Sequence, residues 1–192
     1  MVNGIAQPPT PNNEPVMGFL PGSHERIELQ AELAKQMAEV IEIPCIINGE
    51  EIWTGNIVEQ VMPHNHGHVL AKVHLAGEQE VHDAINASLQ AHKAWSTMPW
   101  EARGAIFLKA ATMLAGERRQ EINASTMLNQ SMTCHQAEID SACELIDFWR
   151  FNVDYARAIY EDLQPPISPD GVWNQSAIRP LEGFVFSITP FN

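Results

Sequence analysis

Gly183-Phe184-Val185-Phe186-Ser187-Ile188-Thr189-Pro190-Phe191-Asn192 is the stretch of sequence that decides the fold. An uncharged, mostly apolar run of this length is typical of a buried strand, and Pro190 fixes a turn directly after it. A folded domain rarely ends on its most strand-like run without a polar tail, so we expect the polypeptide to be incomplete. The stretch therefore predicts a sheet strand and offers Asn192 as a candidate functional side chain.

Upstream of this strand the chain is mostly helical in pattern. Residues 1–22 are rich in Pro, Asn and Gly and predict an extended arm. A helical region that leads into a buried strand indicates an α/β fold rather than a closed all-α domain. The predicted helices cover residues 24–41 (with Ser23 as N-cap), 79–95, 99–114, 117–129 and 134–163. The predicted strands cover residues 45–47, 50–53, 58–63, 69–75, 172–178 and 184–188, with an Asn48-Gly49 hairpin turn between the first two.

Composition and charge exclude several classes of protein. The chain has 192 residues, of which 45% are hydrophobic and 18% charged, as in ordinary globular proteins. Its net charge of -13, from 11 basic and 24 acidic residues, disfavours a nucleic-acid partner. No window approaches the roughly 18 apolar residues of a membrane span. The first 22 residues contain no Lys or Arg and resemble neither a signal nor a transit peptide, so we predict a cytoplasmic location.

The three cysteines predict neither a disulfide framework nor a zinc site, because their number is odd and no CxxC motif occurs. Cys134 and Cys143 are predicted to lie on opposite faces of one helix, which prevents a bond between them. None of the three, Cys45 included, has a cluster of basic residues nearby in sequence that would stabilise a thiolate. We therefore expect no nucleophile among them and a reducing compartment.

The segment His64-Asn65-His66-Gly67-His68 is the one candidate metal motif. In a strand, alternate imidazoles would share a face and could converge on a cation. Asn65 and Gly67 favour a turn instead, which would scatter the rings. We predict a solvated turn and no metal.

Glu144 is the acid on the long predicted helix whose position is unusual. At helical spacing it shares a face with Ala137, Ser141 and Phe148, which are apolar or small. An acid on such a face could be the counter-ion of a substrate ammonium group, or it could pair with Arg150 or Arg157. The spacing leaves both alternatives open.

Glu138 and Asp140, on the same helix, are predicted to be ordinary solvated residues. The sequence also lacks the GxGxxG, GxxxxGK[ST] and GxSxG motifs. Asn192 could be a simple turn residue. At the carboxyl end of a strand, however, its amide could donate a hydrogen bond to a developing oxyanion.

Several segments together resemble a known family. The strand-to-turn segment from Pro180 to Asn192 resembles that of the aldehyde dehydrogenase superfamily. Further segments narrow the likeness to its Δ1-pyrroline-5-carboxylate (L-glutamate γ-semialdehyde) dehydrogenase family, and the likeness covers nearly the whole chain from Asn13 onward. These segments are Asn13-Glu14-Pro15-Val16, Ile43-Pro44-Cys45, Pro63 to His68, Ile106 to Ala111, and Gln136 to Asp140 continuing to Phe151-Asn152.

The resemblance implies NAD-dependent oxidation of glutamate semialdehyde to glutamate in proline degradation. A cysteine thiolate attacks the carbonyl, hydride passes to NAD, and water hydrolyses the thioester. By matching motifs, Asn192 is the oxyanion stabiliser, Thr189 contacts NAD near the nicotinamide ribose, and Glu144 faces the amino group of the substrate. No metal is implied. A homo-oligomer is implied for a full-length member.

The resemblance also divides the chain. Residues 23–163 would form the helix-rich N-terminal part of the cofactor domain, 164–182 a bridging strand that contacts another subunit, and 183–192 the first strand of the NAD-binding sheet. Met132 stands where the family usually has a lysine. The family's nucleophilic cysteine, general-base glutamate and ribose-binding lysine have no counterpart in these 192 residues.

Three hypotheses follow for the function. The leading one is an N-terminal piece of a semialdehyde dehydrogenase that is inactive alone. The second is a non-catalytic module that docks onto full-length subunits through its helices and residues 172–178. The third is a metal protein built on His64 to His68.

Overall fold

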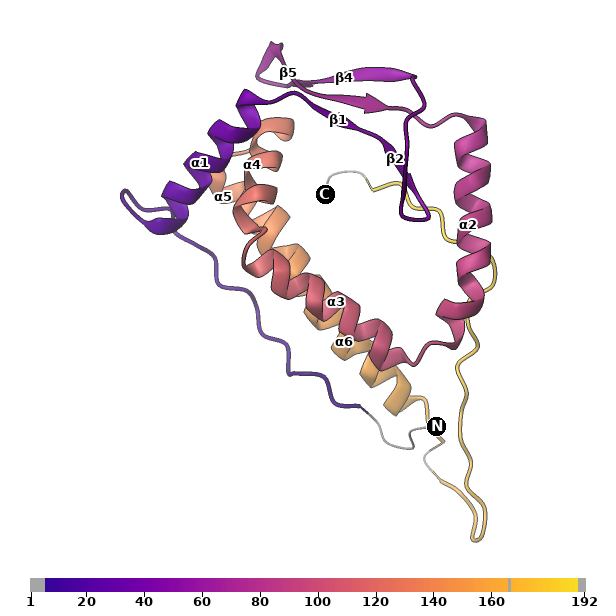
Figure 1. Ribbon diagram of the computed structural model, residues 1–192. Helices are drawn as coiled ribbons and strands as arrows, with labels where there is room; N and C mark the ends of the chain where they lie inside the picture. Colours follow the sequence, from indigo (N-terminus) through magenta and orange to yellow (C-terminus); the bar gives the residue numbers. More distant parts are fainter. Residues whose placement is uncertain (1–5, 166, 190–192) are drawn as a thin grey trace.

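A computed structural model describes residues 6–165 and 167–189 (Figure 1). It is a mixed helix and strand fold, as predicted. Helices α3 and α6 lie side by side, a small sheet lies beyond α1 and α4, and α2 stands apart from the other helices. The helices are α1 (His24–Ala38), α2 (Glu78–Thr97), α3 (Trp100–Ala115), α4 (Arg119–Gln130), α5 (Cys134–Ala137), the π-helix η1 (Glu138–Cys143) and α6 (Glu144–Asp162). The strands are β1 (Ile41–Ile43), β2 (Cys45–Ile47), β3 (Glu50–Ile52), β4 (Ile57–Met62) and β5 (Asn65–His74).

The strands form a three-stranded sheet and a separate hairpin. In the sheet, in the order β1-β5-β4, β1 is parallel and β4 antiparallel to the central β5. The hairpin of β2 and β3 turns at Asn48 and Gly49, with φ angles of 54° and 80°. These positive angles are the ones that a type I′ turn needs, so the predicted hairpin is confirmed.

The first helix is shorter than predicted. It ends at Ala38 because Ile41–Ile43 pairs with Ala71–Val73 of β5 as a strand. β-branched residues fit a pleated surface better than a helix, and this pairing outweighs the helical spacing. Ser23 does occupy the N-cap position, although its side chain makes no capping hydrogen bond.

Within residues 6–165 and 167–189, three small apolar clusters make up the core. The first joins α3 to η1 and α6, the second joins the arm to α1 and α4, and the third joins the sheet to α4. Gly104 of α3 lies so close to α6 that a Cβ there would stand 3.1 Å from Cγ1 of Val153. The helices α3 to α6 therefore form the closely packed part of the molecule. The buried apolar residues of the three clusters are Ala111, Leu114, Ala142 and Ile146 in the first, Phe19, Leu29 and Ala124 in the second, and Met62, Leu70 and Leu128 in the third.

The predicted long helix does run from Cys134 to the end of α6, but it is not uniform. Thr133 and Gln136 close its start with reciprocal hydrogen bonds, Gln136 N to Thr133 Oγ1 at 3.3 Å and Thr133 N to Gln136 Oε1 at 3.0 Å. In η1 the backbone hydrogen bonds join residues five apart instead of four. Glu144 N therefore donates to the carbonyl of Ile139, five residues back. Such single π turns are frequent at functional sites.

The two strands predicted near the C-terminus are absent from the described residues. Residues 172–178 and 184–188 have no strand pairing, and the predicted burial of the second is wrong, since Phe186 and Ile188 are each 78% exposed. A strand is held by hydrogen bonds to a neighbouring strand, and no strand in the described residues pairs with either segment. Figure 1 shows this part of the chain running as an extended segment along α2.

Candidate functional site

One face of α6 is left open to solvent and carries mostly large side chains. It consists of residues spaced three or four apart, which one helical face requires: Glu144, Phe148, Asn152, Tyr155 and Ile159. Phe148 and Tyr155 are each 57% exposed and Ile159 is 53% exposed. Helices in folded proteins normally bury such residues. This α6 face, with its single carboxylate at the N-terminal end, is the candidate functional site.

The π-helix η1 sets the direction of Glu144. Ala137 is completely buried and the hydroxyl of Ser141 lies 2.7 Å from that of Thr126 on α4, whereas Glu144 is exposed. The extra residue in the π turn rotates everything that follows it by about 100° relative to a continuous α-helix. Glu144 therefore shares a face with Phe148 but not with Ala137, and the prediction of one common stripe is wrong in that part.

The salt-bridge alternative for Glu144 is also wrong. Arg150 Nη1 lies 2.6 Å from a carboxylate oxygen of Glu14, and Arg157 pairs with Asp154 and Glu161. Glu144 forms no ion pair or hydrogen bond with any residue that the structure describes. A carboxylate without a partner beside an apolar face can bind an ammonium group, because opposite charges attract more strongly where water is partly displaced.

Glu138, predicted to be solvated, is completely buried at the start of η1. Its carboxylate accepts hydrogen bonds from Arg119 Nη2 at 2.5 Å and Nε at 3.3 Å. Asn123 Nδ2 donates to it at 2.8 Å, and so does the backbone N–H of Met17, also at 2.8 Å. A buried charge is tolerated only when it is paired and hydrogen-bonded in this way.

The N-terminal arm completes this buried network. Glu14 of the arm bridges two arginines, with Oε1 2.5 Å from Arg119 Nη1 and Oε2 2.6 Å from Arg150 Nη1. The backbone N–H of Glu14 and the side chain of Asn13 both donate to Asp147, at 2.7 and 2.8 Å. The described part of the arm has no helix or strand before α1 and is bonded to α4, η1 and α6.

The network shifts the protonation of its members. Burial by itself would raise the pKa of Glu138, but the hydrogen bonds from Arg119, Met17 N–H and Asn123 outweigh it and hold this pKa below its usual value. The pKa of Arg119 is raised, since these carboxylates outweigh the effect of its own burial. A lowered carboxyl pKa means that the pair stabilises the fold above the unfolded-state pKa. This stabilisation is lost as the pH falls through the folded-state pKa.

Two of the three cysteines are held by neighbouring groups. Cys143 is buried beside the network, and burial, followed by the charge of Glu138, raises the pKa of its thiol to about 11. Arg119 Nη2 lies 3.4 Å from its sulfur but does not offset these effects. Cys45 donates to the carbonyl of His74 at 3.2 Å. A buried thiol with a raised pKa is a weak nucleophile, whereas the absence of a nucleophile among all three cysteines stays a prediction.

Of the other two predicted site residues the structure describes one, Thr189, and no contact among the described residues brings it to the α6 face. Thr189 is exposed in the extended segment and forms no hydrogen bond with Glu144. Asn192 lies outside the described residues. Among the described residues no group of three or more His, Cys, Asp or Glu could hold a metal.

The histidine segment differs from the predicted turn. His66 and His68 lie in β5, which begins at Asn65, while His64 precedes the strand and its Nδ1 lies 2.8 Å from Ser131 Oγ. The pairing with β4 steps from Met62↔Asn65 to Val61↔Val69, so Gly67, which the sequence analysis assigned to a turn, lies in an irregular part of the strand.

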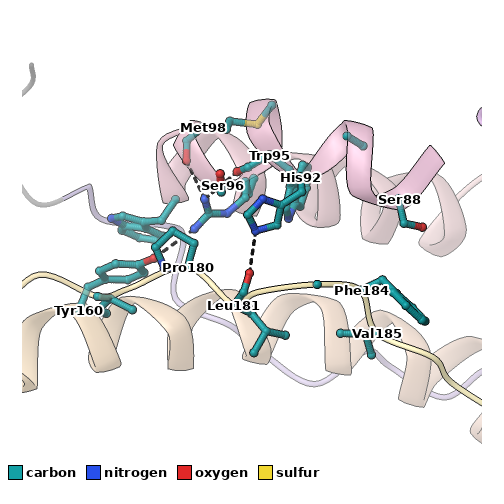
Figure 2. A pocket seen from close by; sticks show the side chains of 15 residues that line it. Ser88, His92, Trp95, Ser96, Met98, Tyr160, Pro180, Leu181, Phe184 and Val185 are labelled. Atoms are coloured by element: carbon teal, nitrogen blue, oxygen red, sulfur yellow. Dashed lines mark hydrogen bonds between the residues drawn. The ribbon is translucent and has the colours of Figure 1, made fainter. Parts of the chain in front are cut away.

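A pocket of about 490 Å³ lies between α2, the α3–α6 pair and the C-terminal segment (Figure 2). Its floor is aromatic, with the rings of Trp100 and Tyr160 stacked at 5.5 Å. Arg103 donates to Tyr160 Oη at 3.1 Å and to the carbonyl of Met98 at 2.7 Å. His92 Nε2 lies 2.7 Å from the carbonyl of Leu181. The polar groups are thus occupied by the chain itself, and the pocket anchors the C-terminal segment.

Among the described residues, no helix is both long and apolar enough to cross a membrane.

Comparison with known proteins agrees with the sequence resemblance. The Delta-1-pyrroline-5-carboxylate dehydrogenase of Agaricus bisporus is 48% identical over 185 residues, which are 96% of this chain and 34% of that protein. The mitochondrial enzyme of the same name from Homo sapiens is 48% identical over 180 residues, 94% of this chain and 32% of its own. The crystal structure of the Mycobacterium tuberculosis Delta-pyrroline-5-carboxylate dehydrogenase bound with NAD superimposes with a TM-score of 0.95 at 45% identity. It covers 100% of this chain and 36% of that one.

The chain thus spans about a third of the length of these relatives. The family model described as "Aldehyde dehydrogenase family" matches residues 53–192. That match covers most of the sequence, including the α6 face, and the chain belongs to the aldehyde dehydrogenase family.

Proposed function

We propose that this chain forms part of an NAD-dependent dehydrogenase that oxidises L-glutamate γ-semialdehyde, the open form of Δ1-pyrroline-5-carboxylate, to glutamate in proline degradation. The names of the relatives and the NAD bound in the Mycobacterium tuberculosis structure support it. The observation that carries the proposal is the exposed carboxylate of Glu144, unpaired among the described residues, at the end of an apolar helix face. A semialdehyde derived from an amino acid has both an ammonium group and an aliphatic chain to match.

Glu144 would pair with the substrate ammonium group while Phe148 excludes water from the aliphatic chain. Asn192 would donate its amide N–H to the developing oxyanion, and donors placed in this way stabilise the charge that forms in the transition state. The exposed hydroxyl of Thr189 would contact NAD near the nicotinamide ribose. NAD supplies the hydride acceptor when bound. Since none of Cys45, Cys134 and Cys143 fits a nucleophile, that cysteine would come from sequence outside these 192 residues.

The extended C-terminal segment would gain its structure from neighbours. Residues 164–182 would form the bridging strand at a contact with another subunit of a homo-oligomer, and residues 183–192 would form the first strand of the NAD-binding sheet. On this proposal the 192-residue chain is inactive alone. Location in the cytoplasm stays a prediction, because the human relative is named as mitochondrial.

A chimera tests the proposal. Residues 1–192 replace the matching N-terminal third of the Agaricus bisporus relative, and NADH formation is followed with L-glutamate γ-semialdehyde and with propionaldehyde, which has no amino group. We expect Glu144→Gln to raise KM for the semialdehyde by about tenfold or more, the effect of losing one charge-assisted hydrogen bond. The KM for propionaldehyde should stay the same. Equal losses with both aldehydes would contradict the role of Glu144, and steady NADH production by the isolated chain would contradict its inactivity.

A second function, a non-catalytic module that docks onto full-length subunits, is favoured by one observation. Trp173, in the segment predicted to be an edge strand, is 80% exposed. Exposed large aromatic residues of this kind often form the centre of an interface. A pull-down with the full-length Agaricus bisporus enzyme, repeated with Trp173→Ala, tests this function. Failure of the unmodified chain to bind would exclude it.

A further inference from the structure

We infer that the N-terminal arm and Glu138 are positioning elements that set the direction of Glu144 by holding η1 in its π conformation. The inference rests on the function proposed above only for its consequence at Glu144. Its starting point is that the π turn begins at Glu138, the same residue whose carboxylate is fully buried.

Among the described residues, four hydrogen bonds from outside η1 hold that carboxylate from two sides. Arg119 and Asn123 approach from α4, and the backbone N–H of Met17 approaches from the arm. Arg119 is itself fixed by the arm, through Glu14 and through the carbonyl of Pro15 at 2.7 Å. Glu138 therefore cannot rotate about the helix axis without breaking bonds to both α4 and the arm.

A π turn is less favourable than an α turn in an isolated helix, so contacts from outside the helix must stabilise it. In a continuous α-helix the amide of Glu144 would donate to Asp140, four residues back, instead of to Ile139. That change would rotate either Glu138 or Glu144 by about 100° about the helix axis. Since Glu138 is held in place, Glu144 keeps its place on the exposed α6 face.

The arm contributes more than one bond to this arrangement. Glu14 links Arg119 to Arg150 of α6, and its backbone N–H is bonded to Asp147. Because Met17 is bonded to Glu138, the arm contacts the long helix both before and after Glu144. A segment with no secondary structure of its own thus closes the network that orients the candidate site. Glu14 and Glu138 form no hydrogen bond with the residues of the α6 face itself: Glu14 acts through Arg119, Asp147 and Arg150, and Glu138 acts through η1.

The direct test is NMR detection of the coupling across the hydrogen bond from Glu144 N to the carbonyl of Ile139, in the full 192-residue chain. We expect this coupling in the unmodified chain. In Glu138→Gln it should be lost and replaced by a coupling from Glu144 N to the carbonyl of Asp140. Asp140→Asn is the matched control, because it removes a charge from the same turn without touching the network. Persistence of the Ile139 coupling in a folded Glu138→Gln chain would overturn the inference.

A second variant covers the case in which Glu138→Gln does not fold. Glu14→Gln leaves the Arg119–Glu138 pair intact but weakens the hold of the arm. We expect amide exchange at Met17 to become about tenfold faster, the measure of local opening, together with a weaker Ile139 coupling. Faster exchange at Met17 with an unchanged Ile139 coupling would overturn the role of the arm.

The consequence for binding is measured separately in the chimera. Glu138→Gln should raise KM for glutamate semialdehyde by about tenfold with kcat retained, and should leave propionaldehyde unaffected. If the NMR coupling moves to Asp140 while both KM values stay the same, the positioning inference holds and the proposed role of Glu144 fails.

Discussion

Residues of the same type are buried in the packed helices and exposed in the C-terminal segment. Arg119 and Glu138 form an ion pair whose side chains are 2% and 0% exposed, whereas Arg179 and Glu182 form one at 77% and 81%. Ile146 on α6 is completely buried and Ile188 is 78% exposed. Residue type alone does not explain the contrast. What differs is that α3 to α6 and the arm supply each other's partners, while residues 167–189 have no neighbouring strand among the described residues.

Breaking the two ion pairs is expected to give the largest difference between the regions. Arg119→Met leaves Glu138 charged, buried and without its main partner, which costs about 3–5 kcal/mol of unfolding free energy. Arg179→Met, the matched control, should leave the urea midpoint unchanged, because exposed pairs contribute little. Similar losses in both variants would show that the C-terminal segment is as tightly packed as the helices.

Truncating Ile146 and Ile188 extends the comparison of the two regions to apolar side chains. Ile146→Ala removes a fully buried side chain between α3 and α6 and should cost about 2–4 kcal/mol. Ile188→Ala should have no measurable effect on the isolated chain, since there is almost no burial to lose. Urea denaturation of both variants measures the difference. A large cost at Ile188 would contradict the exposed segment.

The close crossing of α3 and α6 is expected to tolerate no added bulk. In Gly104→Val even the first added carbon would stand 3.1 Å from Val153, and we expect overpacking to cost about 1–3 kcal/mol. Gly183→Ala has open space around its Cβ but a φ of 78°, so it tests backbone strain alone. A thermal melt that ranks Gly183→Ala as the more damaging change would argue against this crossing.

The alkaline pH dependence should be the smallest effect. With the pKa of Cys143 raised to about 11, the unfolded thiol ionises first as the pH rises, and this favours the unfolded state. The loss should reach about 1 kcal/mol near pH 10. Cys143→Ala should remove this part of the pH dependence, whereas Cys134→Ala serves as the control. An unchanged profile in Cys143→Ala would contradict the buried, neutral thiol.

Local sequence patterns correctly predicted the turns and helices that depend on residues close together in the chain. The Asn48-Gly49 hairpin, the start of the long helix at Cys134 and the approximate bounds of α2, α3 and α4 all follow from turn chemistry and helical spacing. The mixed fold and the family were likewise evident from the sequence. These features depend on neighbours within a few residues, which the sequence displays directly.

The buried network could not be predicted in the same way. Glu138 looked solvated because its partners, Met17 and Arg119, are 121 and 19 residues away and have no regular spacing. The spacing of apolar residues gives no sign of the π turn, so Glu144 was wrongly predicted to share a helix face with Ala137. The strand at residues 184–188 was predicted from apolar character alone, but a strand also requires a partner to pair with.

The most direct test of the contrast between the two regions is amide hydrogen exchange along the full 192-residue chain. We expect the amides of α4, η1 and α6 to be protected nearly to the level of global unfolding, and those of residues 172–178 and 184–188 to exchange almost as freely as an unfolded chain. Protection of residues 184–188 equal to that of α6 would contradict the account, because it would mean that this segment is paired and buried in the chain itself.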